Sequence, residues 1–209
     1  TSSVNGTLKS YDPNLLLKTI KYFQDKNYQI VFAGREKLPD DFLKKSIINY
    51  ANSEYTSSLN DLLLVEGCSF VICSGSGFSE IPYSLDKPIL IYNTHHISQY
   101  FGNRTILLPT LLSRRRKKFN AKLQHLYLCT YGPTCGYDKF DDFYIHHMPT
   151  SEEVFMAAKE IEEIMSDNIP PLTTLQKKIH DNNSFQLLSY GLSRISNFYL
   201  TKHAYFFEK

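Results

Sequence analysis

Residues 70–90 of this 209-residue chain read FVICSGSGFSEIPYSLDKPIL. The apolar residues at the start of this stretch predict a buried strand that ends at Cys73, and the small residues after it predict a tight turn. We expect a helix from Gly77 to Leu85 and a second buried strand from Pro88 to Tyr92. A strand, a short helix and another strand in this order are typical of a parallel sheet.

The same alternation of helices and apolar strands continues on both sides of this stretch. Asp12 and Pro13 suit the first turn of a helix, and Ser57 or Ser58 suits the cap of another that runs to Glu66. The second of these helices is expected to turn three leucines inward: Leu59, Leu62 and Leu63. Short strands are expected at residues 28–33, 46–50 and 105–108. The predicted fold class is α/β, a Rossmann-like parallel sheet with helices on both faces, followed by C-terminal helices.

Three parts of the chain differ in pattern. Residues 1–110 form the predicted Rossmann-like core, and residues 111–148 are a basic, aromatic insertion or lid with an irregular pattern. Residues 149–209 are predicted to complete the domain with helices at positions 150–165, 172–179 and 185–200. The last helix has an apolar stripe, which either packs on the core of the domain or docks a partner: Phe185, Leu188, Leu192, Ile195 and Tyr199.

The charges of the chain are nearly balanced. Its 23 Lys and Arg residues and 21 Asp and Glu residues give a net charge of +2, which disfavours a nucleic-acid-binding protein. The densest basic run extends from Arg114 to Lys118. It is either a solvated loop, a lid over an anionic donor, or a patch that faces anionic lipid headgroups. No apolar run reaches about 18 residues, so we expect a cytoplasmic protein, peripheral to the inner membrane if the basic run contacts lipid.

The turn between the two strands has the composition of a phosphate-binding loop. Small residues let backbone N–H groups approach an anion, and the start of a helix adds partial positive charge. Three serines supply hydroxyls beside these groups: Ser74, Ser76 and Ser79. Glu80 lies where it would accept hydrogen bonds from the hydroxyls of a ribose. The alternative interpretation is that Gly75 and Gly77 only permit a tight turn.

Two histidines, His95 and His96, follow the strand that ends at Tyr92 and are expected at the same edge of the sheet. An imidazole there would contact a phosphate or act as an acid or base, whereas the simpler interpretation is a pair of surface-loop histidines. No other residue is assigned a catalytic role. The chain has neither Cys-x-x-Cys nor His-Glu-x-x-His, and we expect no metal.

Together these elements resemble the donor-binding half of GT-B glycosyltransferases and sugar-nucleotide 2-epimerases. The sequence is more similar to a family of bacterial glycosyltransferases found among surface-polysaccharide genes, over about residues 10–110. Five motifs match in order: residues 31–34, 48–53, 61–64, 70–78, and Lys87-Pro88 with Tyr92-Asn93. Two positions differ, since Phe32 stands near the place of a family arginine and Asn49 replaces an aspartate. Arg35 would substitute for the arginine.

The resemblance implies a metal-independent glycosyltransferase that needs no cofactor and moves a sugar from a nucleotide-sugar to a glycan or lipid-linked acceptor. Gly75, Ser76 and Gly77 would hold the diphosphate. Glu80 would bind the ribose, and Arg35 or His95 the phosphates. The absence of Asp-x-Asp, the metal-binding motif of GT-A enzymes, agrees with this class.

GT-B enzymes have two Rossmann-like halves, so the resemblance also implies that this chain is one half, without the acceptor domain. Two alternatives stay open. One is a nucleotide-sugar 2-epimerase, which needs the donor site alone. The other is a non-catalytic module that binds a nucleotide-sugar or a partner protein.

Overall fold

The computed structural model describes residues 12–34, 38–43, 46–75, 77–94, 102–114, 144–181 and 193–204. Its α-helices are α2 (Leu17–Asp25), α3 (Asp40–Leu43), α4 (Ser58–Gly67), α5 (Glu80–Ser84), α8 (Ser151–Ile164), α9 (Thr174–His180) and α11 (Asn197–Lys202). Its short 3-10 helices are η1 (Pro13–Leu16), η2 (Tyr50–Asn52) and η3 (Gly77–Ser79). Its strands are β1 (Ile30–Phe32), β2 (Ile47–Asn49), β3 (Val71–Ser74), β4 (Ile89–Thr94), β5 (Thr105–Pro109), β6 (Leu111–Arg114), β7 (Tyr144–His147) and β8 (Arg194–Ile195).

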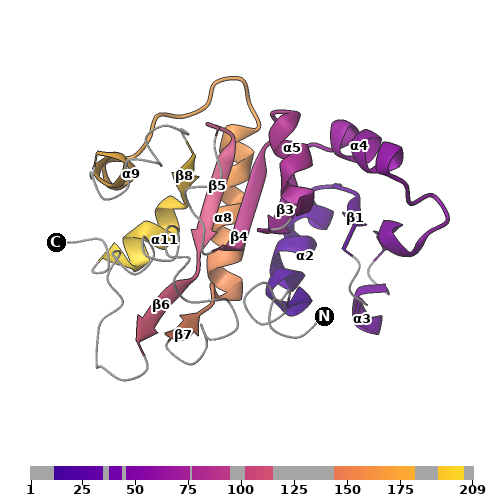
Figure 1. The fold of residues 1–209 in the computed structure, drawn as a ribbon, viewed down its shortest axis with the longest axis horizontal. Coiled ribbons are helices and arrows are strands. Elements are labelled where there is room, and N and C mark those ends of the chain that lie inside the picture. The colour runs from indigo at the N-terminus through magenta and orange to yellow at the C-terminus, as the bar shows by residue number, and fades with distance from the viewer. Residues whose placement is uncertain are drawn as a thin grey trace.

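The centre of the fold is a four-stranded parallel sheet with the strand order β3-β4-β5-β8 (Figure 1). Every residue of β4 and β5 is buried, because both strands lie inside the sheet and are covered by other elements. A second parallel pair, β1 and β2, precedes this sheet in the chain. The prediction of an α/β fold with a Rossmann-like parallel sheet is therefore confirmed.

Helix α8 covers the sheet with its apolar face. It contacts β4 and β5 and packs beside α2 and α11. Its inward-facing residues are fully buried: Val154, Ala157, Ala158 and Ile161. The two alanines are small, so the helix can pack closely against the buried leucines of the sheet.

Side-chain caps begin three helices where the sequence predicts them. Asp12 and Ser57 each accept a backbone N–H from the helix that follows, over 2.9 and 3.1 Å. Thr150 and Glu153 form a reciprocal capping box at the start of α8. The predicted starts of η1, α4 and α8 are thus confirmed.

The predicted helix at residues 185–200 is wrong at residues 193–196, and its residues 185–192 lie outside the described part of the chain. Arg194 and Ile195 form strand β8, which pairs in parallel with β5, and a shorter helix, α11, follows. The open edge of β5 provides hydrogen bonds to this segment, and Ile195 is buried as a result. Ile195 and Tyr199, the described members of the apolar stripe, belong to the core of the domain. The other three members lie outside the described residues.

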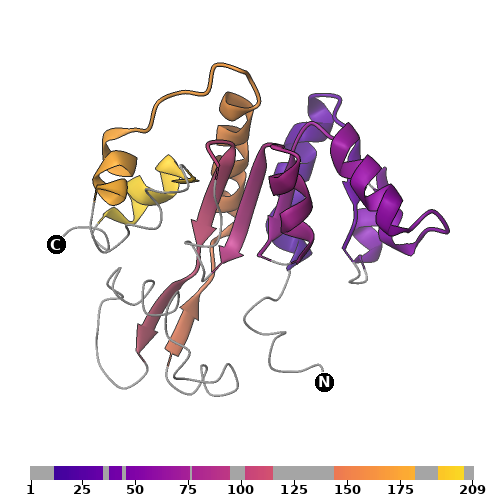
Figure 2. The same cartoon turned by 45° about the horizontal axis from the view of Figure 1, so that its top comes forward.

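The described ends of the insertion at residues 111–148 form regular strands, where the sequence predicts an irregular pattern. Strands β6 and β7 pair antiparallel, with Leu111 opposite His147 and Arg114 opposite Tyr144. We call this pair of strands the arm. Figure 2 shows that it extends from the end of β5 beyond the sheet. The rest of the basic run, up to Lys118, lies outside the described residues.

Helix α4 faces the opposite way from the prediction. Leu59, Leu62 and Leu63 are exposed, and Val65 is the buried residue of the helix. The opposite side of the helix is held by Asp61, which accepts a 2.7 Å hydrogen bond from the hydroxyl of Tyr50. The apolar spacing located the helix, but this polar contact and the packing of Val65 set its rotation.

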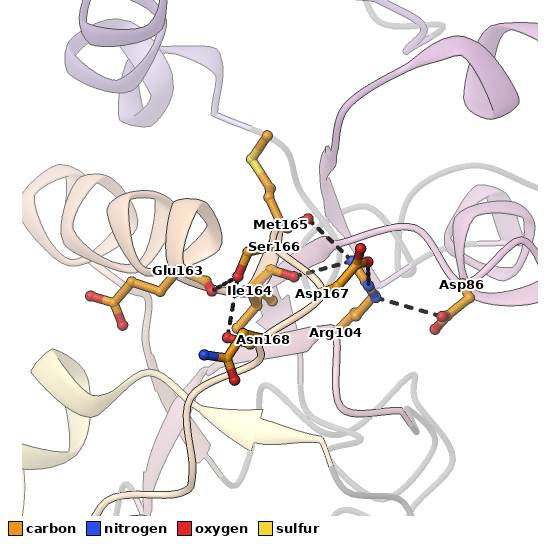
Figure 3. A network of polar contacts seen from close by, with 8 residues as sticks. All are labelled: Asp86, Arg104, Glu163, Ile164, Met165, Ser166, Asp167 and Asn168. Atoms are coloured by element: carbon orange, nitrogen blue, oxygen red, sulfur yellow. Dashed lines mark hydrogen bonds and ion pairs between the residues drawn. The ribbon is translucent and has the colours of Figure 1, made fainter.

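Arg104 joins three segments at the amino edge of the sheet, just before β5 (Figure 3). Its guanidinium donates to the carbonyl oxygens of Ile164 and Met165, over 3.3 Å each, at the C-terminal end of α8. It also lies 3.3 Å from Asp167 Oδ1 and 3.5 Å from Asp86 Oδ2. Both carboxylates are well exposed, so the contacts with the helix end contribute more to stability than the ion pairs.

Replacing Arg104 by alanine should lower the free energy of unfolding by about 2 kcal/mol, because the last carbonyls of α8 lose a charged donor. The melting temperature should fall by about 4–8 °C in a thermal denaturation curve. Arg104→Lys keeps the positive charge but lacks the planar guanidinium group. It should therefore lower the free energy of unfolding by roughly half as much as Arg104→Ala. Asp86→Asn, which removes only an exposed ion pair, should change stability by less than about 0.5 kcal/mol. A loss in Asp86→Asn as large as in Arg104→Ala would contradict this account.

Candidate functional site

The turn after β3 lies at the carboxyl end of the parallel sheet. Strand β3 ends at Ser74, which is paired in register with Tyr92 of β4. Gly75 follows, and η3 and α5 then lead back toward the start of β4. In open parallel sheets, ligands bind at this edge, outside the carboxyl ends of the strands. The structure therefore brings the turn and the end of β4 together, as the sequence predicts.

The side chains of the turn differ in their exposure. Gly77 and Glu80 are exposed, and a Cβ atom added at Gly77 would meet no atom within 4 Å. Ser74 and Gly75 are half-buried. Ser79 is fully buried, so its hydroxyl is not on the surface of the turn. Among the described residues from 74 to 80, Gly77 and Glu80 are thus the exposed ones.

Four of the predicted site residues lie outside the described part of the chain. These are Arg35, Ser76, His95 and His96. The predictions that Arg35 and His95 contact phosphates, and that His95 or His96 acts as an acid or base, therefore stay predictions. Of the others, Ser74 ends β3, Gly75 follows it, Gly77 begins η3 and Glu80 begins α5.

Cys73 lies next to this turn and is sensitive to the charge of Glu80. Burial, with a smaller contribution from the Glu80 carboxylate, raises the pKa of the Cys73 thiol to about 12. The thiol is therefore neutral at physiological pH, and the local charge comes from Glu80. A carboxylate at this position accepts hydrogen bonds and repels anions. It is therefore better suited to binding the hydroxyls of a ribose than to binding a phosphate group.

The end of β4 has an unusual backbone. Asn93 is buried and has a φ of 53°, in the left-handed region, where the register between β4 and β5 shifts. Its side-chain oxygen accepts a 2.7 Å hydrogen bond from Thr110 Oγ1, and Thr110 N donates to Thr94 O over 2.9 Å. These bonds hold the end of β4 against the start of the arm. Sequence reasoning included Asn93 in a motif but missed Thr110, for which the sequence offers no local signal.

The arm begins at the same edge of the sheet as the turn. Strands β3, β4 and β5 are parallel, so their carboxyl ends share one edge, and Thr110 joins β5 directly to β6. Arg114, at the far end of β6, is the first residue of the basic run. The described part of the arm thus starts at the edge where a ligand of the turn would bind.

A second polar contact connects two of the sequence motifs. The hydroxyl of Tyr50 donates to Asp61 Oδ1 over 2.7 Å, and Ser53 Oγ donates to Tyr50 O over 2.7 Å. Desolvation, with the hydrogen bond to Asp61, raises the pKa of the Tyr50 phenol. Asp61 thus anchors α4 to the turn after β2, and this contact accounts for an acidic residue in the first turn of the helix.

A buried carboxylate, Glu153, lies at the start of α8. Its Oε1 atom is 2.8 Å from Lys202 Nζ and 2.7 Å from His203 Nε2, and its other oxygen accepts the N–H of Thr150 over 2.7 Å. Desolvation raises the pKa of Glu153, but the hydrogen bonds outweigh it, so the net pKa is lowered. This cluster connects α8 to α11.

The lowered pKa of Glu153 predicts a loss of stability in acid. The stabilisation is complete above the unfolded pKa of about 4.3 and is lost as the pH falls through the lower pKa of the folded state. The free energy of unfolding in urea should therefore fall more steeply below about pH 4 in the wild type than in Glu153→Gln. Glu163→Gln, an exposed residue of the same helix, should follow the wild-type curve. If the free energy of unfolding falls equally steeply with pH in the wild type and in Glu153→Gln, the lowered pKa of Glu153 does not stabilise the fold.

No group of three or more His, Cys, Asp or Glu side chains in the described residues is arranged to hold a metal ion. Within the same residues, no helix has both the length and the apolar character needed to cross a membrane. Comparison of the chain with protein-family models, curated proteins and solved structures gives no match.

Proposed function

We propose that this chain is the donor-binding domain of a glycosyltransferase that uses a nucleotide-sugar in surface-polysaccharide synthesis. One observation supports this most directly: the segment with the exposed residues Gly77 and Glu80 follows β3 at the carboxyl edge of a parallel sheet, where Ser74 pairs with Tyr92 of β4. The order of the five sequence motifs supports the same class.

In this proposal the open side of Gly77 admits a diphosphate close to the backbone, where N–H groups would donate to its oxygens. Glu80 would accept hydrogen bonds from the ribose hydroxyls. Arg35 and His95 would contact the phosphates. The leaving diphosphate would be stabilised by these donors without a metal ion.

The acceptor would be a glycan or a lipid-linked sugar. The arm begins at the same edge of the sheet as the turn, and the basic run from Arg114 to Lys118 would bring positive charge toward the donor or toward anionic headgroups. The protein would then work at the cytoplasmic face of the inner membrane, with the acceptor domain supplied by another part of the enzyme.

The test is a thermal-shift panel of UDP-, GDP-, CMP- and ADP-sugars. A donor present at ten times its Kd should stabilise the protein by about 1.4 kcal/mol, which raises the melting temperature by about 3–6 °C. No shift with any nucleotide-sugar would overturn the proposal. If a donor binds, product analysis distinguishes the outcomes: transfer to an acceptor marks a transferase, and epimerisation of the donor alone marks a 2-epimerase. Binding without either reaction marks a binding module.

A further inference from the structure

Helix α4 presents an apolar face to solvent. Leu59, Leu62 and Leu63 lie three and four residues apart, so they share one side of the helix, and they are 65%, 46% and 52% exposed. Tyr55, which is 67% exposed, lies beside the first turn of the helix, since its carbonyl accepts a 2.6 Å hydrogen bond from Asn60. We call these four residues the α4 face. Neighbouring exposed apolar residues of this kind are typical of an interaction surface.

The α4 face is held rigidly by the rest of the domain. Ser57 caps the helix, Asp61 is bonded to Tyr50 on the inner side, and Val65 is buried. At the other end of the helix, Lys87 Nζ donates to the carbonyl oxygen of Glu66. The helix therefore cannot turn its leucines inward without losing these contacts, and a partner would meet a preformed surface.

Exposed acidic residues lie beside the α4 face, and Lys87 contacts the C-terminal end of the helix. Residues 46–86 contain five of the 21 acidic residues and no Lys, Arg or His. The rest of the chain contains the other 16 acidic residues and all 23 Lys and Arg residues. Glu66 is exposed on the next turn of the same side of α4, and Glu54 precedes Tyr55. The apolar surface thus has an exposed acidic side chain next to each end, Glu54 and Glu66. The ammonium of Lys87 binds carbonyl oxygens at the C-terminal end of the helix, and the protein as a whole has a net charge of +2.

We infer that the α4 face docks a basic amphipathic helix of a partner protein. The apolar stripe of such a helix would pack on the leucines, and its Lys or Arg residues would meet Glu66 and Glu54. A second copy of this chain suits the surface less well, because a symmetric contact would place the same acidic residues against each other. An anionic membrane surface is disfavoured by the same charges. The inference does not depend on the proposed donor site.

The test uses two labelled 18-residue helical peptides with the same leucine stripe, one with lysines and one with glutamates on the polar face. Fluorescence anisotropy with the full chain should show binding of the lysine peptide, and the glutamate peptide should bind at least about tenfold more weakly. The double variant Leu62→Ser/Leu63→Ser should bind the lysine peptide at least about tenfold more weakly than the wild type does. Glu66→Lys should also bind this peptide more weakly.

The control for charge is Asp25→Lys, an exposed acidic residue of α2 that makes the same change in net charge as Glu66→Lys. It should leave the Kd of the lysine peptide within about twofold. Because the altered leucines are exposed, the double variant should keep the melting temperature of the wild type to within about 2 °C, which separates lost binding from unfolding. Equal binding of the two peptides, or no effect of the leucine variants, would overturn the inference. A wild-type dimer in sedimentation that becomes monomeric in the double variant would identify a second copy as the occupant instead.

Discussion

Gly77→Val should abolish the rise in melting temperature that a nucleotide-sugar gives the wild type. A Cβ atom at this position would meet no atom within 4 Å beyond the adjacent backbone, and this is the space that a diphosphate would need in order to approach the backbone. The unliganded variant should be nearly as stable as the wild type, since Gly77 is not in the left-handed region and no neighbour must move. Thermal shift with and without the best donor measures both quantities.

The matched control is Gly67→Val at the end of α4, where an added Cβ atom also meets nothing within 4 Å. It should keep the full donor-induced shift. Glu80→Ala should weaken donor binding by about tenfold, because ribose hydroxyls lose a charged acceptor worth about 1.5 kcal/mol. An unchanged shift in Gly77→Val would exclude the turn as the diphosphate site even if the wild type binds a donor elsewhere.

Removal of the Glu160 carboxylate should cause a large loss of stability. Its oxygens accept hydrogen bonds from Ser196 Oγ, Asn197 N and Phe198 N, over 2.7–3.0 Å, so a side chain of α8 caps the first turn of α11. Glu160→Ala leaves these partly buried donors without an acceptor, which should lower the free energy of unfolding by about 3 kcal/mol. The melting temperature should fall by about 6–12 °C.

Two variants test whether the cap is responsible. Glu160→Gln keeps an oxygen that can accept hydrogen bonds and should recover at least half of the loss, whereas Glu163→Ala, on the exposed side of the same helix, should change stability by less than about 0.5 kcal/mol. Hydrogen exchange at the amide groups of Asn197 and Phe198 should accelerate in Glu160→Ala. Unchanged exchange there would mean that the carboxylate stabilises the fold in another way.

The parts of this fold that depend on local signals could be predicted from the sequence. The apolar stretch that leads to Cys73 forms β3, and Pro88 stands directly before β4. Two helices begin after the caps that Asp12 and Ser57 supply. These signals are local because a buried strand needs a continuous apolar run and a helix start needs an acceptor for its first N–H groups. The same local signals placed Gly77 and Glu80 in the segment between β3 and β4.

The surfaces that these elements present depend on contacts between elements, which the sequence pattern does not reveal. The leucines of α4 are exposed because Asp61 bonds to Tyr50 and Val65 takes the buried position. Ile195 is a strand residue because the open edge of β5 was available to pair with it. Thr110 meets Asn93 because two parallel strands end side by side. Each of these outcomes depends on a partner in another element of the fold, and a pattern of apolar and polar residues cannot identify such a partner.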